Sequence, residues 1–204
     1  MKKTYERIAE IRDTAAGINS SDVVWVGGSE GAANEFLSAL AARKNELHNV
    51  TLLVVTGNEP NTALETLRHC GGFRVLSFYK DAISESYRDS GCFGKYEFVT
   101  SPAAKAIGLI SRHYGVNTMV VPVCPPDKNG NCAVDAKQVQ TALAVSLCPS
   151  ITKRIALVDY SMKPSKDAFP LDSFDTIGLY GDFKTRDIFD NSAAADNRKA
   201  KAAA

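Results

Sequence analysis

The chain has 204 residues, and its 24 Lys and Arg residues against 23 Asp and Glu residues give a formal net charge of +1. Hydrophobic residues make up 45% and charged residues 23%, which is the composition of a globular protein with a sizeable core. This near-neutral balance lacks the excess of Lys and Arg that would draw the chain to phosphate backbones or anionic lipid, apart from short clusters at residues 1–3 and 198–201. Nucleic acid is therefore not an expected partner.

The longest apolar runs, residues 50–56 and 118–124, are far shorter than the ~20 residues that cross a bilayer. The polar N-terminus does not resemble a signal peptide, so we expect a cytoplasmic protein with no membrane partner. The five cysteines are an odd number and show neither Cys-x-x-Cys nor paired His spacing. They predict reduced thiols and no metal site.

Helical periodicity over residues 2–18 predicts a first helix, and the apolar run 22–26 predicts a strand buried on both faces. Glycines follow that strand, and helical spacing resumes over residues 34–47. Strands and helices then alternate along the chain, with strands at 50–55, 73–78, 117–123 and 154–159 and helices at 61–70, 81–90, 101–114 and 135–147. This alternation predicts an α/β fold with an open, mainly parallel sheet flanked by helices.

The regular pattern weakens after Asp159, and residues 193–204 are rich in alanine with no core-forming side chain. We therefore expect one α/β domain over residues 1–192 and a disordered tail over residues 193–204.

The first segment that could carry chemistry is Val26-Gly27-Gly28-Ser29-Glu30-Gly31, where a strand gives way to a helix. In open α/β sheets ligands bind outside the carboxyl ends of strands, and a helix N-terminus offers unpaired N–H groups. The glycine spacing matches neither the dinucleotide fingerprint nor the P-loop, which disfavours both chemistries. A tight turn without a ligand explains the same residues, so the motif alone leaves both interpretations open.

The second segment runs from Cys124 through Pro125-Pro126-Asp127-Lys128-Asn129-Gly130 to Cys132. Tandem prolines fix an extended backbone, and Asp-Lys-Asn-Gly is a turn sequence. These residues predict a rigid hairpin at a strand end, with a structural role favoured over a functional one. Cys132 is disfavoured as a nucleophile because no histidine lies near it in the sequence.

The stretch Val-Pro-Val-Cys-Pro-Pro-Asp-Lys-Asn-Gly-Asn-Cys resembles the S-P-P-D-x-N-G-x-C motif of the acetyl-CoA hydrolase/transferase family, which includes 4-hydroxybutyrate and succinate CoA-transferases. Residues 22–31, 36–43 and 49–51 are similar to the family's opening strand, helix and N-V-T strand. Residues 138–147, 155–159 and 170–175 resemble the segments that follow the motif. The resemblance covers residues 1–180 and only the N-terminal half of the family's chain.

The resemblance implies transfer of an acyl group between CoA and a small carboxylate, through covalent intermediates on a glutamate in the family's C-terminal half. CoA or acyl-CoA would be a substrate, with no permanently bound cofactor. The N-terminal half of the family supplies glycine-rich backbone and part of the CoA cleft. By resemblance, the substrate- or CoA-binding residues here are Val26, Gly27, Gly28, Ser29, Gly31, Pro125, Pro126, Asp127, Asn129 and Gly130.

No segment resembles the family's glutamate-bearing strand, so the resemblance implies a chain that is inactive alone. The missing half would come from the same gene or from a separate subunit, and a homo-oligomer is a further expectation. Glu30 is a weak local substitute, because the family's position is not the nucleophile and a glutamate at a helix N-terminus commonly stabilises the dipole. Ser29 and Asp159 also depart from the family's pattern. The alternatives are a stand-alone CoA- or nucleotide-binding module and an inactive truncated fragment.

Overall fold

The computed structural model describes residues 7–56, 61–78, 97–99, 104–136 and 138–181. The main path of the sheet runs β1-β10-β8-β6-β2-β3-β4-β5, and every neighbouring pair along it is parallel. Its strands are β1 (Ile8–Glu10), β2 (Val23–Val26), β3 (Val50–Val55), β4 (Phe73–Phe78), β5 (Glu97–Val99), β6 (Thr118–Val123), β8 (Lys153–Val158) and β10 (Thr176–Leu179). The predicted α/β class with a mainly parallel sheet is confirmed.

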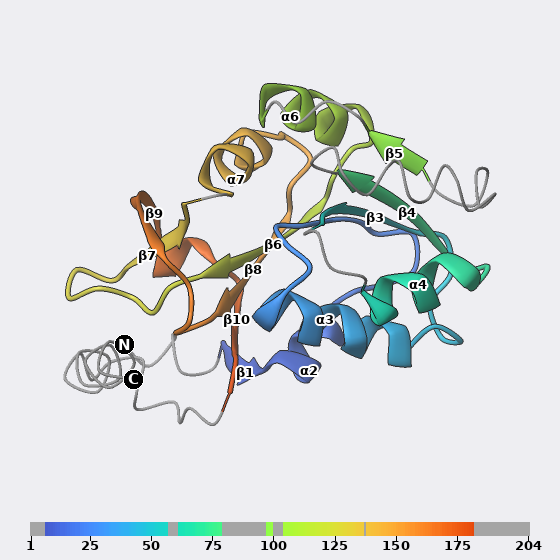
Figure 1. Cartoon of the computed structure of the whole chain (residues 1–204), viewed down its shortest axis with the longest axis horizontal. Helices are drawn as coiled ribbons and strands as arrows, with labels where there is room; N and C mark the ends of the chain where they lie inside the picture. The colour runs from blue at the N-terminus through green and yellow to red at the C-terminus, as the bar shows by residue number, and fades with distance from the viewer. Residues whose placement is uncertain (1–6, 57–60, 79–96, 100–103, 137, 182–204) are drawn as a thin grey trace.

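Helices cover both faces of the sheet (Figure 1). On one face lie α2 (Ile11–Ala15), α3 (Gly31–Ala42) and α4 (Thr62–His69), and on the other lie α6 (Ala104–His113) and α7 (Val139–Ser146). Side chains alternate along the central strands, so that Val24 and Val26 join the core under α3 while Trp25 joins the core under α7. Burial on both faces explains why these strands are continuous apolar runs.

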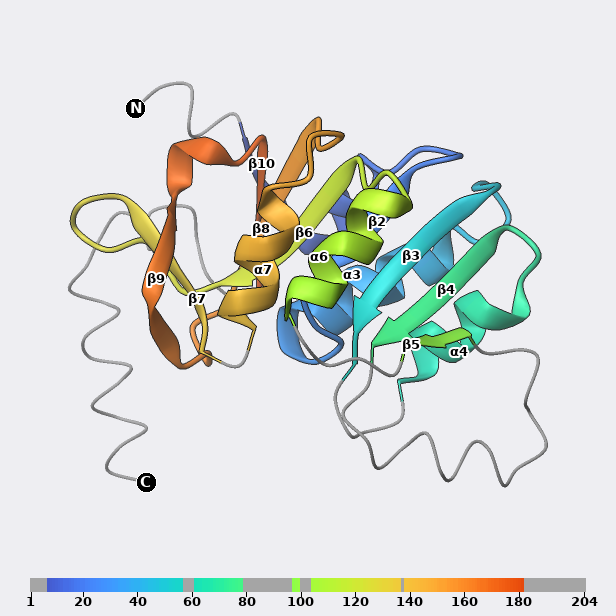
Figure 2. The ribbon, with the colours of Figure 1, turned by 90° about the horizontal axis from the view of Figure 1, so that it is seen from above.

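A two-stranded antiparallel ribbon extends from the sheet beside β6 (Figures 1 and 2). Strand β7 (Asn131–Asp135) pairs with β6 through Val123 and Val134, and β9 (Pro164–Pro170) pairs with β7. A short 3-10 helix, Leu171–Ser173, then leads into β10. The hairpin predicted after β6 is confirmed.

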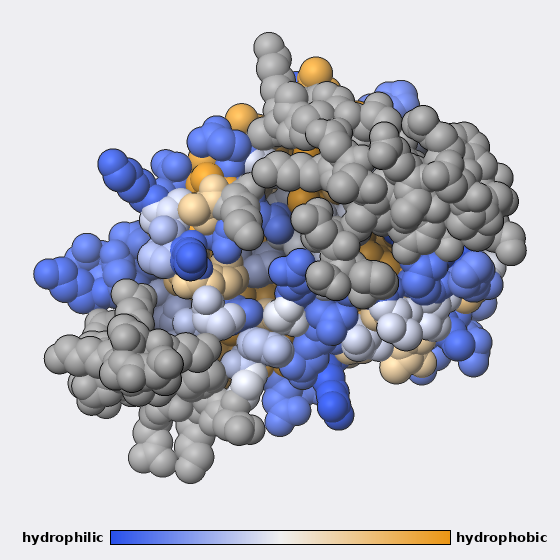
Figure 3. Space-filling view, in the orientation of Figure 1, coloured by the Kyte–Doolittle hydropathy of each residue, from blue (hydrophilic) through white to orange (hydrophobic). Residues whose placement is uncertain are grey.

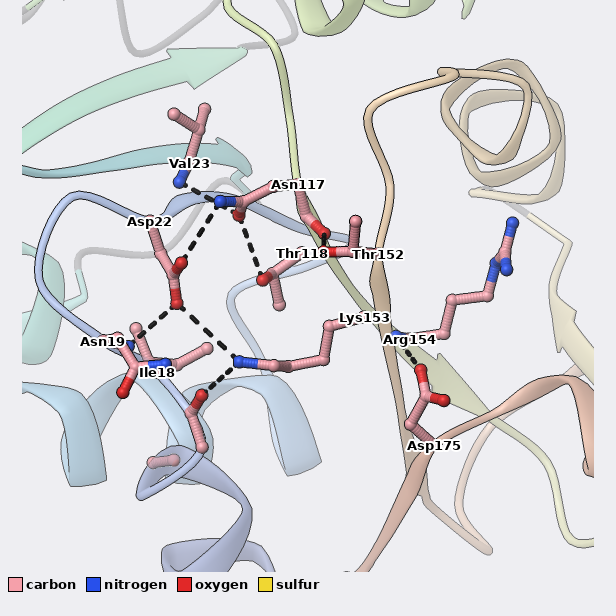
Figure 4. Close-up of polar contacts among 12 residues, drawn as sticks. Ile18, Asn19, Asp22, Val23, Asn117, Thr118, Thr152, Lys153, Arg154 and Asp175 are labelled. Carbon is pink, nitrogen blue, oxygen red and sulfur yellow. Dashed lines mark hydrogen bonds and ion pairs between the residues drawn. The ribbon is translucent and has the colours of Figure 1, made fainter.

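The amino ends of β2, β6 and β8 are joined by one polar network (Figure 4). Asn117 donates from Nδ2 to Asp22 Oδ1 at 3.1 Å, and its Oδ1 accepts from Val23 N at 3.2 Å and from Thr118 Oγ1 at 3.1 Å. Lys153 Nζ lies 3.8 Å from Asp22 Oδ2 and also donates to the carbonyl of Gly17. Three neighbouring strands are thus tied together at the edge opposite their carboxyl ends.

The first predicted helix is wrong over Ile8–Glu10, which form β1 and precede the short helix α2. Strand β1 pairs with β10 in the register Ile8 to Ile177, and the Arg7 guanidinium donates to the carbonyl of Phe174 at 2.7 Å. Pairing with a strand late in the chain overrides the local helical spacing. Helix α3 begins and ends earlier than predicted. The predicted helix 81–90 and tail 193–204 lie outside the described residues.

Among the described residues, two large hydrophobic side chains are strongly exposed, Leu109 at 57% and Leu147 at 73%. Leu109 lies in α6, and Leu147 directly follows α7. Figure 3 shows hydrophobic surface over these two helices. Within the same described ranges, no helix combines the length and apolar character needed to cross a membrane.

Candidate functional site

The carboxyl ends of β2 and β6 mark the point where the order of strands reverses. From β2 the sheet continues through β3 and β4 on one side, and through β6 and β8 on the other. Such a switch point is where open α/β sheets bind ligands. The predicted glycine turn follows β2 at this point, and Gly27 N donates to the carbonyl of Val120 on β6 at 3.0 Å.

Two of the turn's glycines are required by the chain's own side chains. A Cβ on Gly27 would lie 2.8 Å from Cη2 of Trp25 and 3.3 Å from Cδ of Pro122. Gly31 has φ of +53°, and a Cβ there would lie 2.5 Å from Oδ2 of Asp159. Neither glycine therefore needs a ligand to explain it.

Asp159, directly after β8, caps helix α3 from a neighbouring strand. Its carboxylate is buried and accepts from Ala32 N at 3.3 Å, while Ser161 donates from its backbone N at 2.8 Å and from Oγ at 2.6 Å. A carboxylate is favourable there because helix N-termini carry partial positive charge. The expectation that this N-terminus presents free N–H groups is corrected for Ala32, whose N–H is already paired.

Asn61, the N-cap residue of α4, holds the other side of the turn. Its Oδ1 accepts from Leu64 N at 2.9 Å, which is the usual N-cap hydrogen bond. Its Nδ2 donates to the Ser29 carbonyl at 2.7 Å and to Asn34 Oδ1 at 2.9 Å. The glycine turn is thus fixed from two neighbouring elements, α4 and β8.

Glu30 is the N-cap residue of α3. Its side chain is exposed and makes no capping hydrogen bond to the helix that it precedes. Ser29, in contrast, is buried at 6% exposure.

The loop from Pro125 to Gly130 is organised by Asp127. Its Oδ1 accepts from Asn129 N at 2.8 Å and from Asn131 N at 2.9 Å, and its carbonyl accepts from Gly130 N at 2.9 Å. The hydrogen bond from the Asn131 backbone is the main cause that lowers the pKa of Asp127. Gly130 has φ of +78°, which explains its glycine. A structural role therefore accounts for Asp127 and Gly130.

The two predicted segments start from adjacent strands but diverge. Figures 1 and 2 agree that the loop between β6 and β7 projects from the sheet in a direction away from α3. The residues that gather around the turn are instead Pro122 of β6, Asp159 after β8, Asn61 before α4 and Gln138 before α7. Sequence reasoning assigned none of these four to the site. Asn61 carried a signal as a capping residue type at the start of a predicted helix, and Asp159 carried one as a departure from the family's pattern.

Cys132 is buried at 0% exposure on β7. Burial raises the pKa of its thiol to about 12, so the group is a neutral thiol near pH 7. Within the described ranges, no cluster of three or more His, Cys, Asp or Glu side chains could hold a metal ion.

Neither a protein-family model nor the sequence of a curated protein matches the chain. Solved structures do match. RipA from Yersinia pestis superposes with a TM-score of 0.62 at 16% identity, over 88% of this chain and 44% of RipA. A 4-hydroxybutyrate CoA-transferase from Porphyromonas gingivalis superposes with a TM-score of 0.56 at 13% identity, over 85% of this chain and 39% of the transferase. A variant of the decarboxylase AibA/AibB superposes with a TM-score of 0.52 at 13% identity, over 85% of this chain and 82% of the matched chain.

These similarities define the class of fold. The chain has a CoA-transferase-like α/β fold, with its glycine turn at the switch point of a parallel sheet. It spans less than half the length of the RipA and CoA-transferase chains that it matches.

Proposed function

We propose that this chain forms the N-terminal half, or a separate small subunit, of an enzyme that acts on CoA thioesters as a CoA-transferase or acyl-CoA hydrolase. The single observation that carries the proposal is the glycine turn at the switch point of a CoA-transferase-like fold. The catalytic glutamate would belong to a C-terminal half, supplied by the same gene or by another subunit.

The turn would contribute backbone donors to the thioester. In the described part of the chain, Gly28 N and Glu30 N have no protein acceptor; Glu30 is exposed, whereas Gly28 is buried beside Gln138. Attack on a thioester develops negative charge on the carbonyl oxygen, and fixed backbone N–H groups stabilise that charge. These two amides are the donors that we assign to this task.

Asp159 indicates which end of the substrate the turn would receive. A buried carboxylate already pairs with the N-terminus of α3, so a phosphate placed there would meet like charge. The acyl thioester end of acyl-CoA, which is uncharged, fits this position better than the nucleotide phosphates. We therefore assign the turn to the acyl group and not to the phosphates.

Nuclear magnetic resonance of the full chain, labelled with 15N and titrated with acetyl-CoA, tests the site. We expect shifts at the backbone amides of Gly28 and Glu30, and loss of these shifts in Gly28→Ala. The matched control is Gly71→Ala, since a Cβ at Gly71 meets nothing within 4 Å. Absence of shifts at the turn in the unsubstituted chain would overturn the assignment.

Exchange of labelled acetate into acetyl-CoA tests where the nucleophile lies. We expect none with the purified chain and recovery of exchange when the C-terminal half is added. Exchange by the chain alone would overturn the assignment of the nucleophile to another half. Saturable CoA binding without any dependence on a second half would instead support the stand-alone binding module.

This chain covers 82% of the matched chain of the decarboxylase AibA/AibB but 39% of the 4-hydroxybutyrate CoA-transferase, so a separate subunit and a fused C-terminal half are both proposed. The downstream DNA distinguishes the two arrangements. An in-frame continuation supports a fused C-terminal half, while an adjacent reading frame with a glutamate-bearing strand supports a subunit.

A further inference from the structure

Gln138 lies over the glycine turn, although it belongs to the opposite layer of helices. It immediately precedes α7, and its Nε2 is 3.2 Å from the position of a Cβ on Gly28. The same space is bordered by Cβ of Ala33 at 3.7 Å and Cγ of Pro122 at 3.9 Å. One carboxamide end and two apolar carbons therefore border the space over Gly28.

The backbone of Gln138 is fully used, but its side chain is not. Its N–H donates to the Asp135 carbonyl at 2.9 Å, and its carbonyl accepts from Ala142 N at 2.9 Å. The side chain makes no capping hydrogen bond to α7, and its Oε1 is buried without a partner among the described residues. Exchanging the two ends of the carboxamide leaves one polar atom over Gly28 and the other enclosed in either case.

An unpaired buried carboxamide oxygen opposes folding, whereas a leucine of similar length would fill the same space at no such cost. Packing alone therefore favours an apolar residue at this position. A ligand that pairs with the carboxamide would account for the glutamine, since buried polar groups are normally satisfied.

We propose that Gln138 is a substrate-binding residue whose carboxamide donates a hydrogen bond to the acyl carbonyl oxygen held over Gly28. The enclosed end of the carboxamide would then accept from a donor of the same ligand or from a water bound with it. This inference rests on the proposed acyl-CoA site and adds a side-chain donor, from the face of the sheet opposite α3, to the backbone amides of the turn.

The variant Gln138→Leu tests the inference, with Gln140→Leu as the matched control because Gln140 is exposed on the same helix. We expect Gln138→Leu to raise the Kd for acetyl-CoA about tenfold, the loss that one hydrogen bond to a ligand produces. We also expect its melting temperature to stay unchanged or to rise, because an unpaired buried oxygen is removed. Gln140→Leu should change neither quantity.

The resonance of the Gln138 side-chain amide can be assigned because it is absent from the spectrum of Gln138→Leu. Its response to acetyl-CoA distinguishes the proposed acyl-CoA site from the proposed role of Gln138 in that site. Shifts of this resonance and of Gly28 on adding acetyl-CoA support both. A shift at Gly28 alone, or unchanged affinity in Gln138→Leu, overturns the role of Gln138 and leaves the acyl-CoA site standing. No shift at either residue overturns both. A lowered melting temperature of Gln138→Leu would show that the carboxamide has a structural partner and would also overturn the inference.

Discussion

The carboxylate of Asp159 and the backbone N–H of Ala32 join strand β8 to helix α3 across the switch point, at 3.3 Å and over 127 positions of sequence. This contact fixes the start of α3 from outside the helix, because Glu30 at the N-cap makes no side-chain capping bond. The position of the glycine turn therefore depends on a residue that directly follows β8, which lies two strands from β2 in the sheet.

Replacement of Asp159 by alanine is expected to lower the free energy of unfolding by about 1–3 kcal/mol, since the cap is lost and buried donors are left unpaired. Asp159→Asn should cost less, because its amide oxygen still accepts. Urea denaturation measures both, with Asp167→Ala on the exposed strand β9 as control. Equal stability of Asp159→Ala and the unsubstituted chain would contradict a capping role.

Asn117→Ala is expected to destabilise the fold by about 1–3 kcal/mol, because Val23 N and Asp22 each lose a hydrogen bond within the network of Figure 4. Asn117→Asp should cost at least as much, since it places a second carboxylate opposite Asp22. Chemical denaturation provides the comparison. Acetyl-CoA binding by the folded Asn117→Ala protein should be unchanged, as the network lies at the opposite edge of the sheet from the turn. Reduced affinity would argue against that separation.

Cys132 should resist alkylation in the native protein, because a thiol with a pKa of about 12 is about one part in 10⁴ thiolate at pH 8. Mass spectrometry after treatment with iodoacetamide is expected to find Cys132 modified only in denaturant, whereas the half-buried Cys70 reacts earlier. Native labelling of Cys132 at the rate of Cys70 would contradict its burial.

The same raised pKa has a consequence for stability. The folded-state pKa lies above the ordinary value of 9.0, so the folded chain holds this proton more tightly than the unfolded chain. The contribution of the protonated Cys132 thiol to the free energy of unfolding is fully present below pH 9 and is lost as the pH rises toward 12. Cys132→Val should therefore lose less stability than the unsubstituted chain between pH 8 and pH 10, as measured by urea denaturation.

The central strands could be predicted from the sequence because burial on both faces leaves a continuous apolar run, as in Val23–Val26 and Val50–Val55. The edge strand Ile8–Glu10 could not, because its pairing with Ile177 is a contact between the two ends of the chain, which local periodicity does not encode. The sequence predicts a start of α3 at residue 34, whereas the helix begins at Gly31. Local periodicity does not encode this start either, because the cap comes from Asp159, far along the chain.

The place of the glycine turn after β2 was also predictable, because a strand that ends in glycines before a helix has a simple signature. Its surroundings were not. Gln138 approaches Gly28 from a helix on the other face of the sheet, and no spacing in the sequence connects positions 28 and 138.

The direction of strand β10 determines the side of the sheet on which the chain continues. Since β10 is parallel to its neighbour β8, and β8, β6 and β2 are parallel in turn, Leu179 lies at the edge of the sheet that also carries the glycine turn. The polypeptide therefore leaves the described sheet on the side of the glycine turn. A domain joined after this point would reach the turn without the chain having to cross the sheet.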